Sequence, residues 1–299
     1  MGCSLPRRNS LRRALVPAAL AMLAPAGLAH AYTAAGDRIF PATLVIPQIG
    51  PSDEIYETAS TLPTSDGRTT SLGTTYAKTI TERFGLEIDQ AYSWLDHKAG
   101  GTSAGWANQT ASLRYLAVLD APREFLLTVG MQQEFGNTGT LRTGASRNGA
   151  TTPMVYFGKG LGDLDIGYLR PLAISGTFGY AASDGGPRPD QVVAGLVVEY
   201  SIPYLEAKVA ALKLPAFFRS LTPMVEYFYT TTTTPSHGQS TTATAAPGLS
   251  FSGPGWEFAL EALVPATHAT GTGPGVIAQF HLSLDYLFPD SIGKPLFPW

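Results

Sequence analysis

Hydrophobic and polar residues alternate along most of the chain with a period of two, the pattern of β-strands with one apolar face. In 84–95, for example, Phe84, Leu86 and Ile88 fall on one face, while Glu87 and Asp89 fall on the other. A tilted strand that crosses a membrane needs roughly 9–11 residues, and the alternating segments have about that length. The clearest segments are 84–95, 107–119, 124–135, 190–202, 219–230, 255–265 and 279–288.

Tight and loose connections alternate between these segments. Residues 120–123 and 253–255 form tight turns, whereas longer polar loops cover 97–105, 136–151, 183–189, 233–242 and 266–274. Outer-membrane barrels have short periplasmic turns and longer outer loops. Further strands at 53–62, from about residue 69, and at 152–160, 170–182 and 242–252 bring the count to twelve; a count different by two stays open. The segment 203–218 is too long for a tight turn and predicts a short periplasmic helix.

The last predicted strand, 279–288, has the strongest local pattern. Its apolar face carries Phe280, Leu282, Leu284, Tyr286 and Phe288. This face resembles the C-terminal assembly signal of outer-membrane barrels, which implies the barrel-assembly machinery as a partner. The chain continues through a tail, 289–299, which we expect to fold beneath the barrel or into it. An edge strand of a soluble β-sandwich is the alternative interpretation.

The N-terminus has the three parts of a secretory signal peptide. Four arginines (Arg7, Arg8, Arg12 and Arg13) precede an apolar stretch over 14–29, and Ala29-His30-Ala31 forms an A-x-A-type cleavage site. Pro17 and Pro25 and the shortness of the stretch argue against a membrane-spanning helix. We therefore predict export of the chain and cleavage after Ala31, while the arginine pairs leave twin-arginine export open.

Composition supports a β-barrel in the outer membrane of a Gram-negative cell. Only 14% of the residues are charged, against about a quarter in a typical soluble domain. After the signal peptide no apolar run is long enough for a spanning helix, so a membrane protein of this sequence must satisfy its backbone hydrogen bonds in a closed barrel. The part after Ala31 has 16 basic and 23 acidic residues, a formal net charge of −7, which gives no basic patch for nucleic acid.

The polar faces of the predicted strands would line the barrel interior. They carry Glu87, Asp89, Arg114, Glu199, Glu226, Glu257, Glu261, His281 and Asp285. A ring of acidic side chains attracts cations and repels anions. The alternative is that these residues only hydrate the interior or pair with one another.

The segment 37–51 is the best candidate for a plug or constriction. Three prolines, Pro41, Pro47 and Pro51, prevent a long regular strand there. Its apolar residues nevertheless need burial: Ile39, Phe40, Leu44, Val45 and Ile46. We predict that this segment enters the barrel interior.

No residues in the sequence show the spacing of a catalytic or metal site. His281, Ser283 and Asp285 match the residue types of a hydrolase triad, but side chains two residues apart in a strand lie roughly 7 Å apart and run parallel. The histidines His97, His237, His268 and His281 are scattered without ligand spacing. The lone cysteine, Cys3, falls in the signal peptide. The glycines of 158–162 lack the spacing of a phosphate-binding loop. We predict no enzyme activity and no cofactor or metal.

Three segments resemble a known family. They are 36–51 (GDRIFPATLVIPQIGP), 158–164 (GKGLGDL) and 200–205 (YSIPYL), and they look like the outer-membrane barrels grouped as the meta-pathway phenol-degradation family, many of them described as transporters. The resemblance implies a barrel and the passage of small hydrophobic or aromatic compounds. The family offers no catalytic residues to carry over.

Together these observations predict a porin-like channel for the passive passage of small solutes. The predicted parts are a signal peptide (1–31), an N-terminal segment (32–52), a twelve-stranded barrel (53–288) and a tail (289–299). A closed barrel with a structural or interaction role is the alternative, and an outer-membrane hydrolase is a weaker one. The expected partners are membrane lipid, the barrel-assembly machinery and a small solute. The solute, the open or closed state of the lumen and the oligomeric state do not follow from the sequence.

Overall fold

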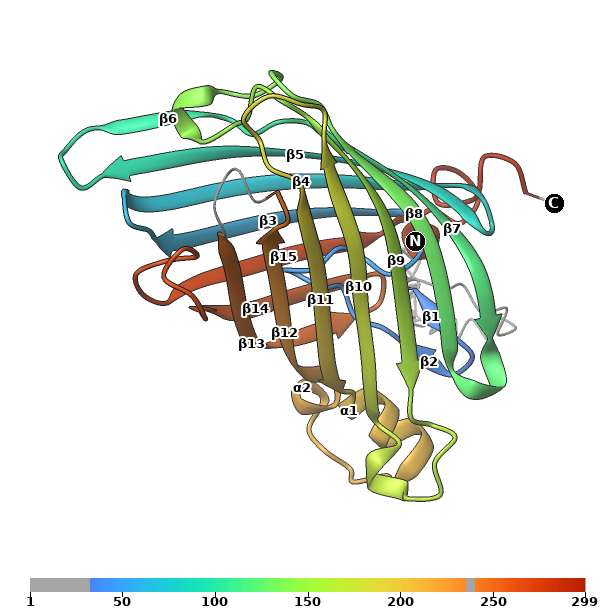
Figure 1. Cartoon of the computed structure of the whole chain (residues 1–299). Helices are drawn as coiled ribbons and strands as arrows, with labels where there is room; N and C mark the ends of the chain where they lie inside the picture. Colours follow the sequence, from blue (N-terminus) through green and yellow to red (C-terminus); the bar gives the residue numbers. More distant parts are fainter. Residues whose placement is uncertain (1–32, 235–239, 299) are drawn as a thin grey trace, which may run out of the picture.

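Twelve antiparallel strands form a closed up-and-down barrel (Figure 1). The computed structural model describes residues 33–234 and 240–298. Each barrel strand pairs with the next along the chain, and β15 pairs with β3 to close the ring. The strands are β3 (Glu54–Pro63), β4 (Gly67–Thr81), β5 (Phe84–His97), β7 (Thr110–Asp120), β8 (Phe125–Glu134), β9 (Ala150–Gly160), β10 (Leu172–Ser183), β11 (Gln191–Tyr200), β12 (Leu221–Thr232), β13 (Thr241–Gly253), β14 (Trp256–Pro265) and β15 (Gly275–Ser283).

The predicted fold class and the count of twelve strands are confirmed. One difference lies in the predicted loop 97–105, part of which is strand. There β6 (Thr102–Trp106) extends the sheet by pairing with the end of β5, so that Tyr92 lies opposite Trp106. The extension is possible because the β5–β6 turn contains two glycines with positive φ, Gly100 (95°) and Gly101 (85°).

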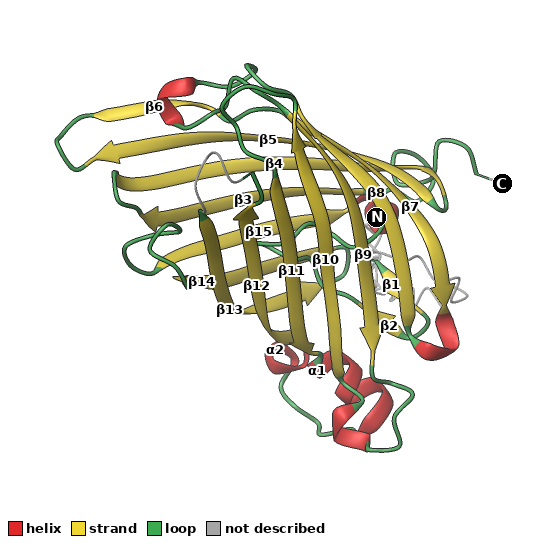
Figure 2. Cartoon of the chain, viewed as in Figure 1, coloured by secondary structure: helices red, strands yellow, loops and turns green. Residues whose placement is uncertain are grey.

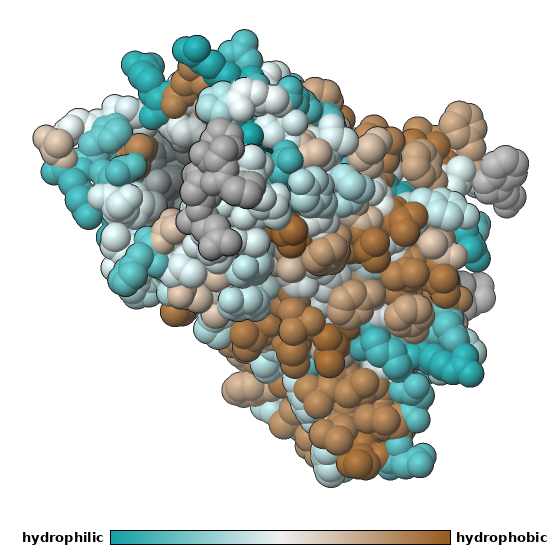
Figure 3. Space-filling model, viewed as in Figure 1, coloured by the Kyte–Doolittle hydropathy of each residue, from teal (hydrophilic) through white to brown (hydrophobic). Residues whose placement is uncertain are grey.

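Alternate residues of each strand face outward and inward, which explains how an apolar surface and a polar lining arise from one sequence. On β11, Leu196 and Val198 are 44% and 41% exposed, whereas Val197 and Glu199, which alternate with them, are buried. Exposed apolar side chains of this kind recur around the barrel, and Figure 3 shows them as a broad surface over the wall. A closed ring with such an exterior is a transmembrane barrel.

The remaining elements lie at the two ends of the barrel (Figure 2). We call the end with the β4–β5, β7–β8 and β13–β14 turns the turn end, and the opposite end the loop end. The turn end also carries the small hairpin of β1 (Ala34–Ala35) and β2 (Arg38–Ile39), with η1 (Ala121–Arg123), η3 (Gly167–Leu169), α1 (Ile202–Tyr204), η4 (Leu205–Val209), α2 (Ala216–Arg219) and α3 (Leu284–Leu287). At the loop end lies η2 (Leu141–Thr143). No helix within 33–234 and 240–298 is long and apolar enough to cross a membrane.

The predicted last strand, 279–288, is wrong at its C-terminal end. The strand β15 ends at Ser283, and the next residues form α3, in which Leu284 is buried and Tyr286 is exposed; Phe288, directly after α3, is exposed as well. The physical reason is the tail, whose Leu296 and Phe297 N–H groups donate to the carbonyls of Thr79 and Ile80 on β4. To reach β4 the chain has to turn away from the barrel wall. Of the five residues of the predicted assembly signal, Phe280 and Leu282 lie on the strand β15. The role of this face in assembly stays a prediction.

We expect the folded protein to show heat-modifiable migration in detergent gels. The ring of backbone hydrogen bonds has no open edge, so detergent at room temperature should leave it intact while boiling unfolds it. Unboiled and boiled samples should therefore migrate at different positions, with urea-unfolded protein as the control for the boiled band. A single band under both conditions would contradict the closed barrel.

Candidate functional site

The barrel interior is lined by buried charged residues and contains the N-terminal segment. Glu87, Arg114, Glu199, Glu226, Glu257, Glu261 and His281 are each at most 4% exposed. All of them lie on barrel strands, as does the half-buried Asp89. The structure therefore brings most of the predicted lumen residues to one inner surface, while their role in passage stays a prediction.

Arg114 neutralises one part of this surface. Its guanidinium binds Glu87 with both terminal nitrogens, and the Nη2 to Oε1 distance is 2.6 Å. The Tyr56 hydroxyl donates to the same carboxylate at 3.1 Å, and the ring of Tyr156 lies 5.3 Å from the guanidinium. Glu87 is thus satisfied within the wall and differs from the other inward acids.

Asp285 does not line the lumen on a strand, because β15 ends two residues before it. It lies on α3 at the turn end, where it accepts a hydrogen bond from the Ser283 hydroxyl. Burial raises the pKa of Asp285 to about 6. His281 faces the Glu54 carboxylate instead, with an Nε2 to Oε2 distance of 3.3 Å. No group of three or more His, Cys, Asp or Glu side chains in 33–234 and 240–298 could hold a metal ion, and His237 lies outside these residues.

The segment 40–49 crosses the interior and packs on several parts of the wall. Phe40 and Ile49 contact one buried cluster, Ile46 a second, and Leu44 a third. The wall residues of these clusters are Leu126, Met154, Tyr156 and Ala173, then Val197, Met224 and Ala259, then Ala246, Leu263 and Ile277. Because they come from β8 through β15, the segment lies within the ring and not beside it.

The Glu226 side chain binds the backbone in the middle of this segment. The N–H groups of Leu44, Val45 and Ile46 all donate to its carboxylate, at 2.6, 2.9 and 2.9 Å. Ala42 donates in the same way to Glu257 at 3.1 Å. Three successive N–H groups around one carboxylate form an anion-binding nest. The segment has no strand partner here, so these carboxylates satisfy backbone groups that would otherwise be buried without acceptors.

Glycines in the wall make room for the segment. A Cβ atom at Gly195 of β11 would lie 2.5 Å from Ile46 Cγ2, and one at Gly158 of β9 would lie 2.7 Å from Ile49 Cδ1. Both distances are too short for real side chains. The wall is therefore shaped for the segment at these two positions.

Arg38 anchors the segment where it enters the barrel. Its side chain is fully buried, donates to the carbonyls of Arg170 and Pro171 at 2.5 and 3.0 Å, and pairs with Glu124 at 3.3 Å. The guanidinium lies 4.1 Å from the ring of Tyr204, whose hydroxyl donates to Glu124 at 2.8 Å. Burial and the Glu124 carboxylate raise the pKa of Tyr204, which keeps its hydroxyl protonated as a donor.

The three family-like segments of the sequence meet at this anchor. The first contributes Arg38, the third contributes Tyr204, and the second contributes glycines beside Glu124. A Cβ atom at Gly160 or Gly162 would collide with the Glu124 carboxylate, and Gly162 also donates its N–H to Glu124 at 3.0 Å. Sequence reasoning singled out the segments but missed Arg38, Glu124 and Tyr204 as contacting residues.

Ile39 was expected to be buried with the plug, and this is wrong, since 55% of its surface is exposed. Residues alternate in the β2 strand, so when Arg38 turns into the anchor Ile39 must point away from it. It lines a cavity of about 250 Å³ at the turn end together with Pro41 and Tyr204. Phe40 and Ile46 are buried as expected, and Leu44 is half-buried.

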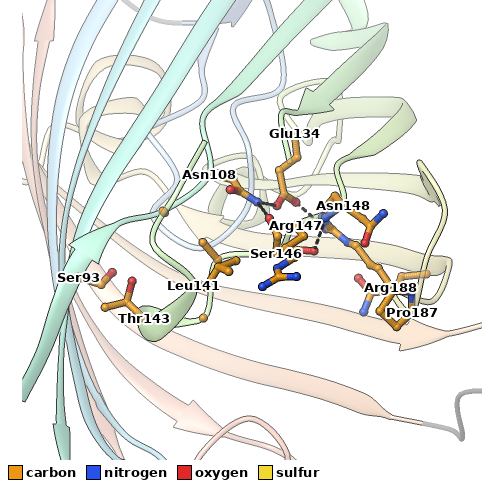
Figure 4. Close-up of a pocket in the computed structure, with 14 residues that line it drawn as sticks. Ser93, Asn108, Glu134, Leu141, Thr143, Ser146, Arg147, Asn148, Pro187 and Arg188 are labelled. Carbon is orange, nitrogen blue, oxygen red and sulfur yellow. Dashed lines mark hydrogen bonds and ion pairs between the residues drawn. The ribbon is translucent and has the colours of Figure 1, made fainter. Parts of the chain in front are cut away.

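A larger pocket of about 850 Å³ lies at the loop end (Figure 4). Arg188 pairs with Glu134 at 2.5 Å, and Asn108 donates to the other oxygen of Glu134 at 2.7 Å. Arg147 lies among the lining side chains and is exposed. Glu134 ends β8, whereas Arg147 and Arg188 come from the predicted loops 136–151 and 183–189. No motif in the sequence marked these residues as a pocket.

Comparisons with known proteins agree on the fold alone. No protein-family model matches the chain, and no curated protein matches it. Among solved structures, the COG4313 outer membrane channel from Pseudomonas putida F1 is 12% identical, with a TM-score of 0.50, over 82% of this chain and 99% of that one. The chain has the fold of an outer-membrane barrel. The KdgM porin (14% identity, TM-score 0.46) and the NanC porin (8%, 0.48) each align over 77% of this chain and 98% of their own. Membership of the phenol-degradation family stays a prediction.

Replacing Glu226 by Gln should loosen the segment. The amide keeps one acceptor oxygen and turns an N–H₂ group toward the backbone donors, so charge-assisted bonds of roughly 1.5–3 kcal/mol are weakened. Hydrogen exchange at the amides of 44–46 should become about tenfold faster or more. Glu199→Gln is the matched control, since Glu199 is an equally buried acid that, within the described part of the chain, accepts no bond from the segment. Equal protection in both variants would contradict the role of Glu226.

Gly195→Ala should displace the segment by contact alone. The new Cβ would overlap Ile46, so either Ile46 or the backbone near it has to shift. We expect a thiol placed at Val45 to react faster with a polar maleimide in this background. Gly73→Ala serves as the control, because the nearest atom to a Cβ there is 3.8 Å away. Unchanged reactivity in Gly195→Ala would show that the segment is not seated against β11.

Proposed function

We propose that this protein is an outer-membrane channel for the passive diffusion of small solutes, and that residues 40–49 close it at rest. The observation that carries the proposal is the segment held inside the ring by the Glu226 nest. It contributes no strand to the barrel, so it can leave without breaking the wall. A polar lining and a pocket at the loop end complete the expected path for a solute.

The predicted signal peptide and the fold support an outer-membrane location, with the turn end in the periplasm. Residues 1–32 lie outside the described residues, so cleavage after Ala31 stays a prediction. The C-terminal strand would carry the contact with the assembly machinery. The pocket of Glu134, Arg147 and Arg188 would then open to the cell exterior and receive the solute.

The lining favours cations over anions deeper in the lumen. Glu87 is neutralised by Arg114. Within 33–234 and 240–298, Glu199 and Glu261 form no ion pair with a basic side chain, and Glu261 lies beside the Glu226 carboxylate. A preference for hydrophobic or aromatic compounds rests on the family resemblance alone. No enzymatic step and no cofactor form part of the proposal.

A closed barrel with a structural or interaction role is the second candidate. The three apolar clusters around the segment favour it, because burial of Phe40, Ile46 and Ile49 stabilises the closed state. The two candidates differ in what happens when the segment is removed.

Deletion of 33–50 should increase conductance in planar bilayers. The native protein should show low conductance with brief openings, whereas the shortened chain should conduct steadily and prefer K⁺ over Cl⁻. The control is Glu57→Gln in the full-length chain, since Glu57 is an exposed acid of β3 that lies outside both the segment and the buried lining of the lumen. If the deletion leaves conductance unchanged, the plug is refuted. If neither protein conducts although both show the folded gel band, the closed barrel is the better description.

A further inference from the structure

The turn end carries apolar side chains that a periplasmic turn does not need. We define the turn-end lobe as residues 161–171 and 201–220. Six of its large apolar residues are between 40% and 62% exposed: Ile166, Tyr168, Leu169, Leu212, Phe217 and Phe218. Figure 3 shows this apolar surface continuing from the barrel wall onto the part that carries α1 and α2.

The two turns pack together, so the lobe is one unit. The position of a Cβ at Gly167 is 3.5 Å from Val209 Cγ1. The Tyr200 hydroxyl, at the end of β11, donates to the Tyr168 carbonyl at 3.2 Å. The lobe is therefore fixed to the wall and to itself, and its exposed residues are held in place.

Helix α2 lies against the outer face of the wall and not below the lumen. The ring of Phe217 stacks on Phe251 of β13, with centroids 5.2 Å apart and an interplanar angle of 28°. Phe251 in turn lies 5.6 Å from Trp256, which lies 6.3 Å from Phe280. Phe251 faces outward, since its neighbour Ser250 is fully buried on the inside. Phe217 thus extends an aromatic row of the lipid-facing wall.

Basic residues accompany these aromatic rings. Lys213 precedes α2 and Arg219 is its last residue; both are exposed, although the chain after Ala31 is acidic. Aromatic rings at the edge of the apolar band, with basic side chains beside them, are typical of segments that lie in a membrane interface. Basic residues close to a membrane surface are attracted to anionic headgroups.

We propose that the turn-end lobe is a phospholipid-binding anchor. Phe217 and Phe218 enter the acyl-chain boundary of the leaflet at the turn end, and Lys213 and Arg219 contact the phosphates of anionic phospholipids. The continuity of Phe217 with the aromatic row of the wall selects lipid as the occupant. The anchor is independent of whether the lumen opens.

A fluorescent label at position 217 tests the insertion. The sequence has one cysteine, Cys3, so Phe217→Cys in a Cys3→Ser background gives a single labelling site in the full chain. In phosphatidylcholine vesicles with brominated acyl chains, the label should be quenched to within about twofold of a label at Leu196→Cys on the wall. A label at Arg142→Cys, at the loop end, should be quenched by iodide instead. The folded gel band verifies each variant.

Mixtures of two lipids, of which only one has brominated acyl chains, test whether the basic residues contact anionic headgroups. With equal amounts of phosphatidylglycerol and phosphatidylcholine, the label at 217 should be quenched more strongly when the bromine is on phosphatidylglycerol. Lys213→Gln with Arg219→Gln should remove this difference while keeping the total quenching. Persistence of the difference in the double variant would overturn the assignment of these two residues.

Two results would overturn the insertion. If iodide quenches the label at 217 as strongly as the label at 142, the lobe is in water. If neither iodide nor brominated lipid reaches it, another protein surface, such as a second copy of this chain, covers α2.

Discussion

The hydrogen-bonded ladder between β15 and β3 is the constraint on which the rest of the structure depends. It joins Val276 with Thr61 at one end and Ser283 with Glu54 at the other, and it removes the sheet edges that a membrane cannot satisfy. Closure also fixes where the chain before β3 begins. Asp53 binds Lys78 and Thr79 of β4 at the turn end, so the segment that precedes it starts at the rim of the ring. Its apolar side chains pack there on the apolar clusters of the inner wall.

The strands could be predicted because their signal is local. A period of two is visible within ten residues, and the short turns and long loops add a second local signal. The parts that sequence reasoning missed depend on contacts between distant residues. Arg38 finds Glu124, 86 positions later, and the tail finds Thr79 more than two hundred positions earlier. Ile39 and Asp285 were misplaced for this reason, since each follows a residue or an element whose position is fixed by such a contact.

The acidic residues of the predicted ring have different partners in the structure. Alternation correctly indicated that Glu87, Glu226 and Glu261 face inward, but alternation does not show what each carboxylate meets there. Glu87 is neutralised by Arg114, and Glu226 is used by backbone N–H groups of the plug. Glu261 lies beside the Glu226 carboxylate and, within the described residues, is paired neither with a basic side chain nor with N–H groups of the plug. A buried carboxylate is costly unless it is paired or hydrogen-bonded, so these three acids should differ in how much each contributes to the passage of ions.

The manner in which the plug is held explains why it could open without a change in the wall. All backbone pairs of the barrel are made between barrel strands, and none involves the segment 40–49. The backbone groups that its departure would release are the N–H groups bound to Glu226 and Glu257 and the Thr43 carbonyl, which accepts from the Gln279 side chain at 3.3 Å. Water in a polar lumen can satisfy these donors and acceptors. The apolar clusters oppose departure, because Phe40, Ile46 and Ile49 would lose their contacts with the wall. In the proposed channel, the balance between rest and opening would therefore be set by apolar burial at these three residues and by the anchor at Arg38, and not by the strength of the barrel itself.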